Sequence, residues 1–265
     1  MTTKLYHKNG EKPVVFNPKS LVNMPILAIL QSAIILFNKC GRIMKILGII
    51  RKKISFCFSI SICKYIYYNF LSSKVKRIGK GHLIPYKGAV IDIAPNARIN
   101  LINGDLEVGF KKLRKSKAET YIRLRNNAVW NISDTCNISY GATVELLDSA
   151  IIDSNYFTVN CNSVIVIAKK LTVGNDVMIG RNVTIYDSDF HPINNGDFEN
   201  YTIPITIGNH VWIASNSTIL KGVKISDGSV VASNSVIVRN IDDNQLVGND
   251  VKQKIIKNNI EWRRC

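Results

Sequence analysis

One histidine lies where a regular apolar repeat stops. In residues 171–192, LTVGNDVMIGRNVTIYDSDFHP, His191 closes an irregular segment that also contains Asp187 and Asp189. The part of the stretch before this segment repeats an apolar residue every six positions, at Val173, Ile179 and Ile185. Histidine titrates near neutral pH, so it can take a proton from a hydroxyl group, and either aspartate could set its tautomer. His191 is therefore our candidate general base.

The same six-residue rhythm recurs through most of the chain. Shorter runs occur at Ile78, Ile84 and Val90, at Ile93 and Ile99, and at Ile132, Ile138 and Val144. An unbroken run follows the loop at 186–206, with members Ile207, Ile213, Ile219, Ile225, Val231 and Ile237. A period of six fits neither an α-helix nor a long alternating strand. It fits very short strands joined by tight Gly- and Asn-containing turns, which predicts a parallel β-helix with three strands per coil.

The N-terminal segment differs from the rest in charge. Residues 1–80 contain 15 Lys/Arg and one acidic residue, Glu11, whereas residues 81–265 contain 20 Lys/Arg and 18 Asp/Glu, so +14 of the net +16 lies in the first part. A nucleic-acid-binding protein is expected to carry its charge on a folded reading surface, so we predict no nucleic-acid partner. An arm of this charge suits an anionic membrane or an anionic glycan.

Apolar residues accompany this charge. Residues 21–38 are uncharged, and residues 39–71 mix basic, apolar and aromatic residues. The pattern predicts helices in a segment 1–77, which either pack on the body or on a sister subunit, or lie in the plane of a membrane through residues 21–71. A spanning helix is the weaker alternative because Asn23, Pro25 and Gln31 interrupt the apolar run.

The remaining organisation follows from the repeat. We predict a β-helix domain over 78–250 with loop 186–206, and a short helical C-terminal cap over 251–265 that covers the last coil. The six cysteines show no paired spacing, and the first twenty residues show no signal-peptide pattern. We therefore predict reduced thiols and a cytoplasmic location, with peripheral contact to the inner face of the cytoplasmic membrane left open.

Three segments resemble the hexapeptide-repeat acyltransferases, namely VNCNSVIVIAKKLTVG, DSDFHP and IGNHVWIASNSTILKGVKISDGSVVASNSVI. Within that superfamily they are similar to the galactoside and maltose O-acetyltransferases and to enzymes that O-acetylate capsule and O-antigen sugars. The resemblance is strong over 155–255, is limited to rhythm over 78–154, and is absent over 1–77. It implies a mainly β fold, a left-handed parallel β-helix.

The resemblance also implies residue roles. His191 resembles the general base, and Asn160 the residue that positions the acceptor hydroxyl beside it. Trp212 resembles the aromatic residue that walls the acceptor pocket or the thioester end of the donor. The implied donor-binding residues are Trp212, Ala214, Ser215, Ser233, Arg239 and Lys252. The chain departs from the family pattern at Ala168, Ala214 and Asp250, and the last departure weakens the assignment of Lys252.

The implied reaction is O-acetylation of a sugar hydroxyl in a bacterial surface polysaccharide or its precursor. It implies acetyl-coenzyme A as donor, no metal, a carbohydrate acceptor that includes anionic polysaccharide, and a homotrimer whose sites lie between subunits. No serine has a nucleophile-elbow context, so we expect direct transfer without an acyl-enzyme. Two alternatives stay open: N-acetylation of a nucleotide-linked amino sugar, and a non-enzymatic β-helix scaffold tethered to a membrane. A zinc site of three histidines does not fit the spacing of the four histidines present.

Overall fold

The computed structural model describes residues 59–110, 113, 115–191 and 201–249. The chain divides into two compact units, Met1–Phe58 and Ser59–Cys265, and the description concerns the second. The helices expected within 21–58 and the cap expected over 251–265 lie outside the described residues.

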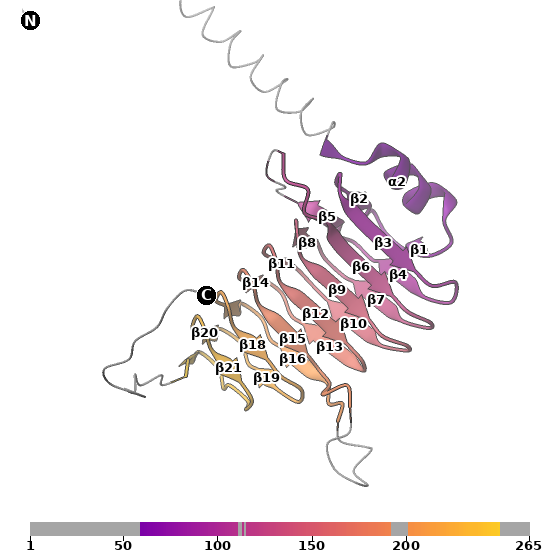
Figure 1. The fold of residues 1–265 in the computed structure, drawn as a ribbon. Coiled ribbons are helices and arrows are strands. Elements are labelled where there is room, and N and C mark those ends of the chain that lie inside the picture. The colour runs from indigo at the N-terminus through magenta and orange to yellow at the C-terminus, as the bar shows by residue number, and fades with distance from the viewer. Residues whose placement is uncertain (1–58, 111–112, 114, 192–200, 250–265) are drawn as a thin grey trace, which may run out of the picture. The chain divides into compact units, whose positions relative to one another are not determined.

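Three parallel sheets make up this unit, and successive strands enter the first, second and third sheet in turn (Figure 1). The first sheet contains β1 (Val75–Arg77), β4 (Arg98–Leu101), β7 (Val129–Ile132), β10 (Ile151–Ser154), β13 (Lys170–Val173), β16 (Ile205–Ile207) and β19 (Lys224–Ile225). The second contains β2 (Leu83–Pro85), β5 (Leu106–Phe110), β8 (Cys136–Ser139), β11 (Phe157–Val159), β14 (Val177–Ile179), β17 (Trp212–Ile213), β20 (Val230–Val231) and β22 (Leu246–Val247). The third contains β3 (Ala89–Ile93), β6 (Thr120–Leu124), β9 (Thr143–Leu146), β12 (Val164–Ile167), β15 (Thr184–Tyr186), β18 (Thr218–Ile219) and β21 (Val236–Ile237).

This arrangement confirms the predicted left-handed parallel β-helix with three strands per coil. Every strand pairs in parallel with the strand one coil away, so the backbone groups of each coil are satisfied by its neighbours. We call the turn from the first to the second sheet the first corner, the turn from the second to the third sheet the second corner, and the turn back to the first sheet the third corner.

One continuous apolar core fills the interior of the coils. Strand residues alternate between buried and outward positions, as the two-residue period of a strand requires. The inward residues of the predicted C-terminal run are all buried: Ile207, Ile213, Ile219, Ile225, Val231 and Ile237. Trp130 is also fully buried, and its indole N–H donates to the hydroxyl of Ser154 at 3.0 Å. The six-residue rhythm is therefore confirmed as the signature of the core in this half.

The predicted register of the first coil is wrong. Ile78 is 58% exposed, and Ile84 and Val90 are not buried. The buried residues of this coil include Val75, Leu83 and Ala89. The reason is the length of the turn between β1 and β2. The inward residues Val75 and Leu83 are eight positions apart, whereas the inward residues from Ile207 to Ile237 follow one another every six positions, so six-residue spacing does not track the inward side here.

Asparagines shape the second corner. Asn162, Asn182, Asn216 and Asn234 occupy one position each in successive coils, with φ between 53° and 62°. Asparagine tolerates this left-handed conformation better than most residues. The amide of Asn182 donates to Asn216 at 3.0 Å, and that of Asn216 donates to Asn234 at 3.1 Å. The column therefore turns the chain and also ties neighbouring coils together.

A short helical stretch covers the N-terminal end of the core. It consists of the α-helix α2 (Ile62–Ile66) and the π-helix η2 (Tyr67–Leu71), which lie over β2 and β3 (Figure 1). The buried amide of Asn69 donates to the carbonyl of Leu83 at 2.7 Å and accepts from its N–H at 2.9 Å. Tyr68 donates to the carbonyl of Ile91 at 2.7 Å. Of the helical residues that the structure describes, none belongs to a helix long and apolar enough to cross a bilayer.

Candidate active site

The loop that carries His191 leaves the β-helix at the third corner, between β15 and β16. Its two ends pair as a short antiparallel ribbon, in which Ser188 lies opposite Thr202. The N–H of Asp189 donates to the carbonyl of Tyr201 at 2.8 Å, and that of Ile203 donates to Asp187 at 2.9 Å. The two loop ends are therefore held to each other before the chain rejoins the coil.

Asp187 attaches this ribbon to the preceding coil. Its carboxylate is fully buried and accepts hydrogen bonds from the backbone N–H groups of Ala168, Lys169 and Lys170 at 2.6 to 2.8 Å. Burial raises the pKa of the Asp187 carboxyl, and the backbone hydrogen bonds oppose that shift. Asp187 therefore acts on the backbone of the corner, and it makes no contact with the His191 ring.

Asp189 is also engaged elsewhere. One of its carboxylate oxygens lies 2.6 Å from the ammonium nitrogen of Lys221, which belongs to the next coil at the same corner. Neither aspartate that the sequence offered as a partner of His191 lies within ion-pair distance of it among the described residues. Both side chains position the loop rather than the imidazole in this structure.

Phe190, the residue before His191, has an unusual backbone conformation. Its φ is +61°, a strained left-handed value for an aromatic residue, and the Ser188 hydroxyl accepts its N–H at 2.9 Å. Its ring packs edge-on against Tyr186, with centroids 5.4 Å apart. His191 is exposed, and within the described part of the chain its imidazole has no hydrogen-bond or ion-pair partner. The imidazole is therefore accessible to a substrate.

The predicted acceptor and donor residues gather at the second corner. Asn160 follows β11, Ala214 and Ser215 follow β17, and Ser233 follows β20. Asn160 and Ser233 are exposed, and Asn160 accepts the N–H of Cys161 at 2.9 Å through its side-chain oxygen. The small residues leave the corner unobstructed along successive coils. A linear molecule could lie along this column.

Glycine and arginine extend this column in the coil between Asn160 and Ala214. A Cβ atom on Gly180 would approach the backbone nitrogen of Ser215 to 2.8 Å, so a side chain is excluded there. The next residue, Arg181, is exposed and is the one basic residue in positions 160–163, 180–183, 214–217 and 232–235. The sequence reading missed Arg181, because its placement on the column depends on knowing which turn forms which corner.

Trp212 lies on the outer face of the second sheet. Its side chain is 49% exposed, and it pairs in register with Met178 on one side and Val230 on the other. Met178 is likewise half exposed. Trp212 therefore stands in an outward apolar row next to the second corner, beside Ala214, and outside the core.

The structure does not bring all of the predicted residues together. Asn160, Ala214, Ser215 and Ser233 share the second corner, whereas His191 lies at the third corner, with the width of the third sheet between them. Arg239 follows β21 and therefore also lies at the third corner. Lys252 lies outside the described residues. Within one chain the candidate base and its candidate partner are on different edges.

Two similarities to known proteins identify the family of this chain. The bacterial transferase hexapeptide family (six repeats) matches residues 204–239, which form the regular C-terminal coils. A Schizosaccharomyces pombe protein named as an acetyltransferase is 31% identical over 164 residues, which cover 58% of this chain and 75% of the relative. The chain belongs to the hexapeptide-repeat acetyltransferases.

Solved structures similar to this hexapeptide-repeat acetyltransferase include two acetyltransferases. One is a hexapeptide-repeat acetyltransferase of Vibrio cholerae in complex with acetyl-coenzyme A, which is 29% identical with a TM-score of 0.33 and a match covering 43% of this chain. The chain spans 60% of the length of that protein. The other is a polysialic acid O-acetyltransferase, 24% identical, with a TM-score of 0.44 and coverage of 69% of this chain and 94% of that one.

Proposed function

We propose that this hexapeptide-repeat acetyltransferase transfers an acetyl group from acetyl-coenzyme A to a sugar hydroxyl, with His191 as general base. The observation that carries the proposal is the exposed imidazole of His191, presented where the chain leaves the coils between β15 and β16. The strained backbone of Phe190 is held by Ser188 and Tyr186, which is the kind of strain found at functional sites.

In the proposed reaction, His191 accepts the proton of the acceptor hydroxyl as its oxygen attacks the thioester carbonyl carbon. A C–O bond forms and the C–S bond breaks. The proton held by His191 then passes to the departing thiolate, so the products are the acetyl ester and free coenzyme A. No nucleophilic side chain is needed, and the buried Cys136 and Cys161 are not available as nucleophiles.

The second corner suits the donor. The pantetheine arm of acetyl-coenzyme A is long and thin, and the column at Gly180, Ala214, Ser215 and Ser233 offers small side chains along successive coils. Arg181 provides a cation on the same edge for a phosphate group of the donor. Trp212 lies next to this column on the second sheet, where its ring would cover the thioester end.

A complete site on this proposal needs a second copy of the chain. His191 and Asn160 lie on different corners, so a neighbouring subunit would bring its second corner against the third corner of the first. Such a contact is head-to-tail rather than self-complementary, and a threefold rotation would close it into a ring of three subunits. A homotrimer would therefore contain three equivalent sites, each with His191 of one subunit and Asn160 of the next.

The acceptor class rests on the resemblance to sugar O-acetyltransferases of bacterial capsule and O-antigen. Within that class we propose a surface polysaccharide or its precursor, with Asn160 placing the hydroxyl near His191. The side-chain amide of Asn160 is exposed, so its N–H groups remain accessible to an acceptor oxygen.

The test is acetyl transfer from labelled acetyl-coenzyme A to a panel of neutral and acidic bacterial glycans by the full chain. His191→Ala should lower kcat at least about 100-fold, because a positioned general base contributes that much or more. The matched control is His210→Ala. His210 is also an exposed loop histidine of the β-helix, but it pairs with Asp176 at 2.6 Å on the first corner, so transfer should stay within about twofold. Unchanged turnover in His191→Ala would overturn the mechanism.

Mixed oligomers test the shared site. His191→Ala and Asn160→Ala should each be nearly inactive alone. Randomly mixed subunits should regain about a quarter of wild-type activity, because half of the subunits keep His191 and half of their neighbours keep Asn160. No recovery in demonstrably mixed oligomers would place both residues in one subunit's site.

The same panel separates the alternatives. Transfer to amino sugars on nucleotide carriers, with none to hydroxyl acceptors, would favour N-acetylation. Absence of any thermal shift with coenzyme A, together with no turnover on any acceptor, would favour a scaffold without enzymatic activity.

A further inference from the structure

The N-terminal end of the β-helix lies in a long acid-free part of the chain. Residues 12–91 contain 14 Lys/Arg and no Asp or Glu. This stretch includes α2, η2, β1, β2 and the start of β3, so the charge reaches the folded body. The first two coils up to Phe110 hold three acidic residues, and each already has a partner: Asp92 with Arg123, Asp105 with His82, and Glu107 with Tyr86.

One side of the helical stretch is apolar, and no other described residue covers it. Its large exposed side chains are Ile62, Ile66, Tyr67, Phe70 and Leu71, between 46% and 73% exposed. Ile62 and Ile66 are four positions apart in α2, so they share one side of that helix, and Tyr67, Phe70 and Leu71 are the exposed apolar residues of the π-helix η2 that follows. The opposite side holds Tyr68 and Asn69, which bind the first coil. Ile78, 58% exposed, adds to the apolar residues just after the helix.

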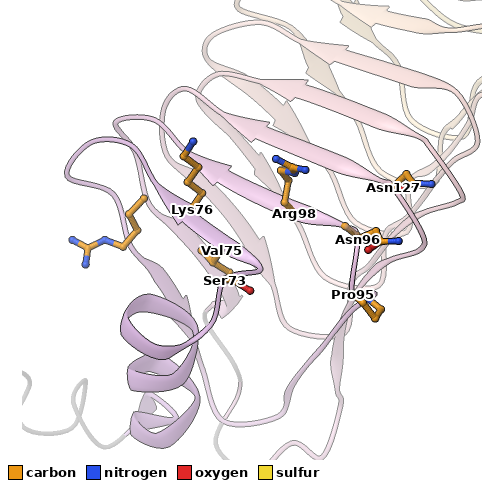
Figure 2. Close-up of a pocket in the computed structure, with 9 residues that line it drawn as sticks. Ser73, Val75, Lys76, Pro95, Asn96, Arg98 and Asn127 are labelled. Atoms are coloured by element: carbon orange, nitrogen blue, oxygen red, sulfur yellow. The ribbon is translucent and has the colours of Figure 1, made fainter.

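Arg77 borders this apolar surface, and two further basic side chains lie on the adjoining first sheet. The guanidinium of Arg77 lies 5.4 Å from the centre of the Phe70 ring, and its Nε donates to the carbonyl of Gly81 at 2.9 Å. Lys76 and Arg98 extend from β1 and β4 on the same side of the first sheet, above a hollow of about 710 Å³ (Figure 2). Ser73, Asn96 and Asn127 add polar groups to the hollow, and its lining contains no acidic residue.

We propose that this end of the β-helix docks on an anionic membrane surface. The apolar side chains of α2 and η2 would enter the boundary between headgroups and acyl chains, and Lys76, Arg77 and Arg98 would meet lipid phosphates. An amphipathic helix with basic flanks binds an interface by apolar burial plus attraction to anionic lipid. The proposal concerns the opposite end of the molecule from the donor column and does not depend on the role of His191.

A lipid surface fits these observations better than a protein partner. A protein would have to offer acidic groups at matching positions, whereas an anionic leaflet attracts any cation close to it. Lys76 and Arg98 are exposed and extended, with no ion pair within the described part of the chain. The exposed Tyr67 also suits the headgroup level, where tyrosine is enriched. The acid-free charge continues into residues 12–58, which gives the same sign of attraction.

Vesicle flotation of the full chain tests the proposal. Wild-type protein should float with phosphatidylcholine vesicles that contain phosphatidylglycerol, and much less with phosphatidylcholine alone. The double variant Phe70→Ser with Leu71→Ser should lower the partition coefficient at least about tenfold, because two large apolar side chains no longer leave water. Lys76→Glu with Arg98→Glu should lower it by a similar factor, with a weaker dependence on salt than wild type.

The matched control is Val238→Ser with Leu246→Ser. These side chains are 61% and 74% exposed in the C-terminal coils, fractions close to those of Phe70 and Leu71, and they lie away from the proposed patch. Their variant should bind vesicles within about twofold of wild type, and circular dichroism should show that all variants are folded. All variants retain residues 1–58.

Several results would overturn the proposal. They are absence of wild-type flotation, equal binding to neutral and anionic vesicles, and unchanged binding of both patch variants. A fourth is a change of oligomer mass in Phe70→Ser with Leu71→Ser at unchanged vesicle binding, which would make the surface a contact between copies of the chain.

Discussion

The N-terminal and C-terminal halves of the β-helix differ in the lengths of their strands and of their coils. In the coils from β16 to β21 the strands have two or three residues, and partners in register are 18 positions apart. In the coils from β1 to β12 the strands have three to five residues, and partners are 24, 31 and 22 positions apart at Val75, Ile99 and Trp130. One half is uniform, and the other is irregular.

Uniform and irregular coils place different kinds of residue at their corners and in their cores. Uniform coils stack the same small corner residues above one another, which produces the straight edge to which the proposed donor would bind. The irregular coils place large residues in the core, such as Trp130 and Phe157, and charged ladders outside, such as Asp92, Arg123 and Glu145. Their stability therefore depends on individual large contacts, whereas that of the uniform coils depends on the register of many small ones.

The largest effect should come from breaking the register of the uniform half. Inserting one alanine between Asn216 and Ser217 would turn the inward residues of that coil outward, because strand side chains alternate with a period of two. We expect the thermal midpoint, followed by circular dichroism, to fall by more than about 10 °C.

The control is the same insertion in the irregular half. An alanine between Ser116 and Lys117 lengthens the connection from β5 to β6, and it should change the midpoint by less than about 3 °C because loop lengthening costs little entropy. Equal losses from both insertions would show that the halves do not differ in this way.

A smaller effect should come from the core of the irregular half. Trp130→Ala removes the largest fully buried side chain and should cost about 3 to 5 kcal/mol of unfolding free energy, measured by urea denaturation. Trp130→Phe keeps most of the volume but removes the hydrogen bond to Ser154, and it should cost about 1 to 2 kcal/mol. In the uniform half, Ile219→Val should cost about 0.5 to 1.5 kcal/mol. A loss in Ile219→Val as large as in Trp130→Ala would contradict the comparison.

The smallest changes in stability should come from substitutions of single corner residues with positive φ. Asn216 has φ +62°, so Asn216→Ala should cost about 1 to 2 kcal/mol, and Asn216→Gly should cost less because glycine accepts this backbone conformation. Ser149 has the same φ in the irregular half, and Ser149→Gly should raise stability by up to about 1 kcal/mol. Denaturant midpoints of the three variants check the order, and a stabilising Asn216→Ala would contradict it.

The sequence predicts the core better in the uniform coils than in the first, irregular coil. Six-residue spacing identified the core of the uniform coils because one turn there has a constant length. It failed in the first coil, where Ile78 is exposed and Leu83 is buried, because the longer turn shifts the inward positions. Spacing carries no information on turn length, so this error could not be detected without the structure.

For the candidate site, sequence located the loop and His191 but not the relations between residues. The placement of Asn160 and His191 on different corners depends on assigning each turn to a corner, which needs the complete strand order. The hydrogen bonds of Asp187 to residues 168–170 were not foreseeable either, because its partners are backbone groups that any residue would supply.

The stack of coils also fixes the distance between His191 and the end that carries α2. In the third sheet, β3, β6, β9, β12 and β15 follow one another, so the loop with His191 leaves the stack four steps from the first coil. At about 4.8 Å per step, the imidazole stands roughly 20 Å along the stack from the end that carries α2. With that end resting on a bilayer, as proposed, the proposed acceptor would meet His191 roughly 20 Å from the membrane surface. Adding or removing one irregular coil would change that distance by about 4.8 Å.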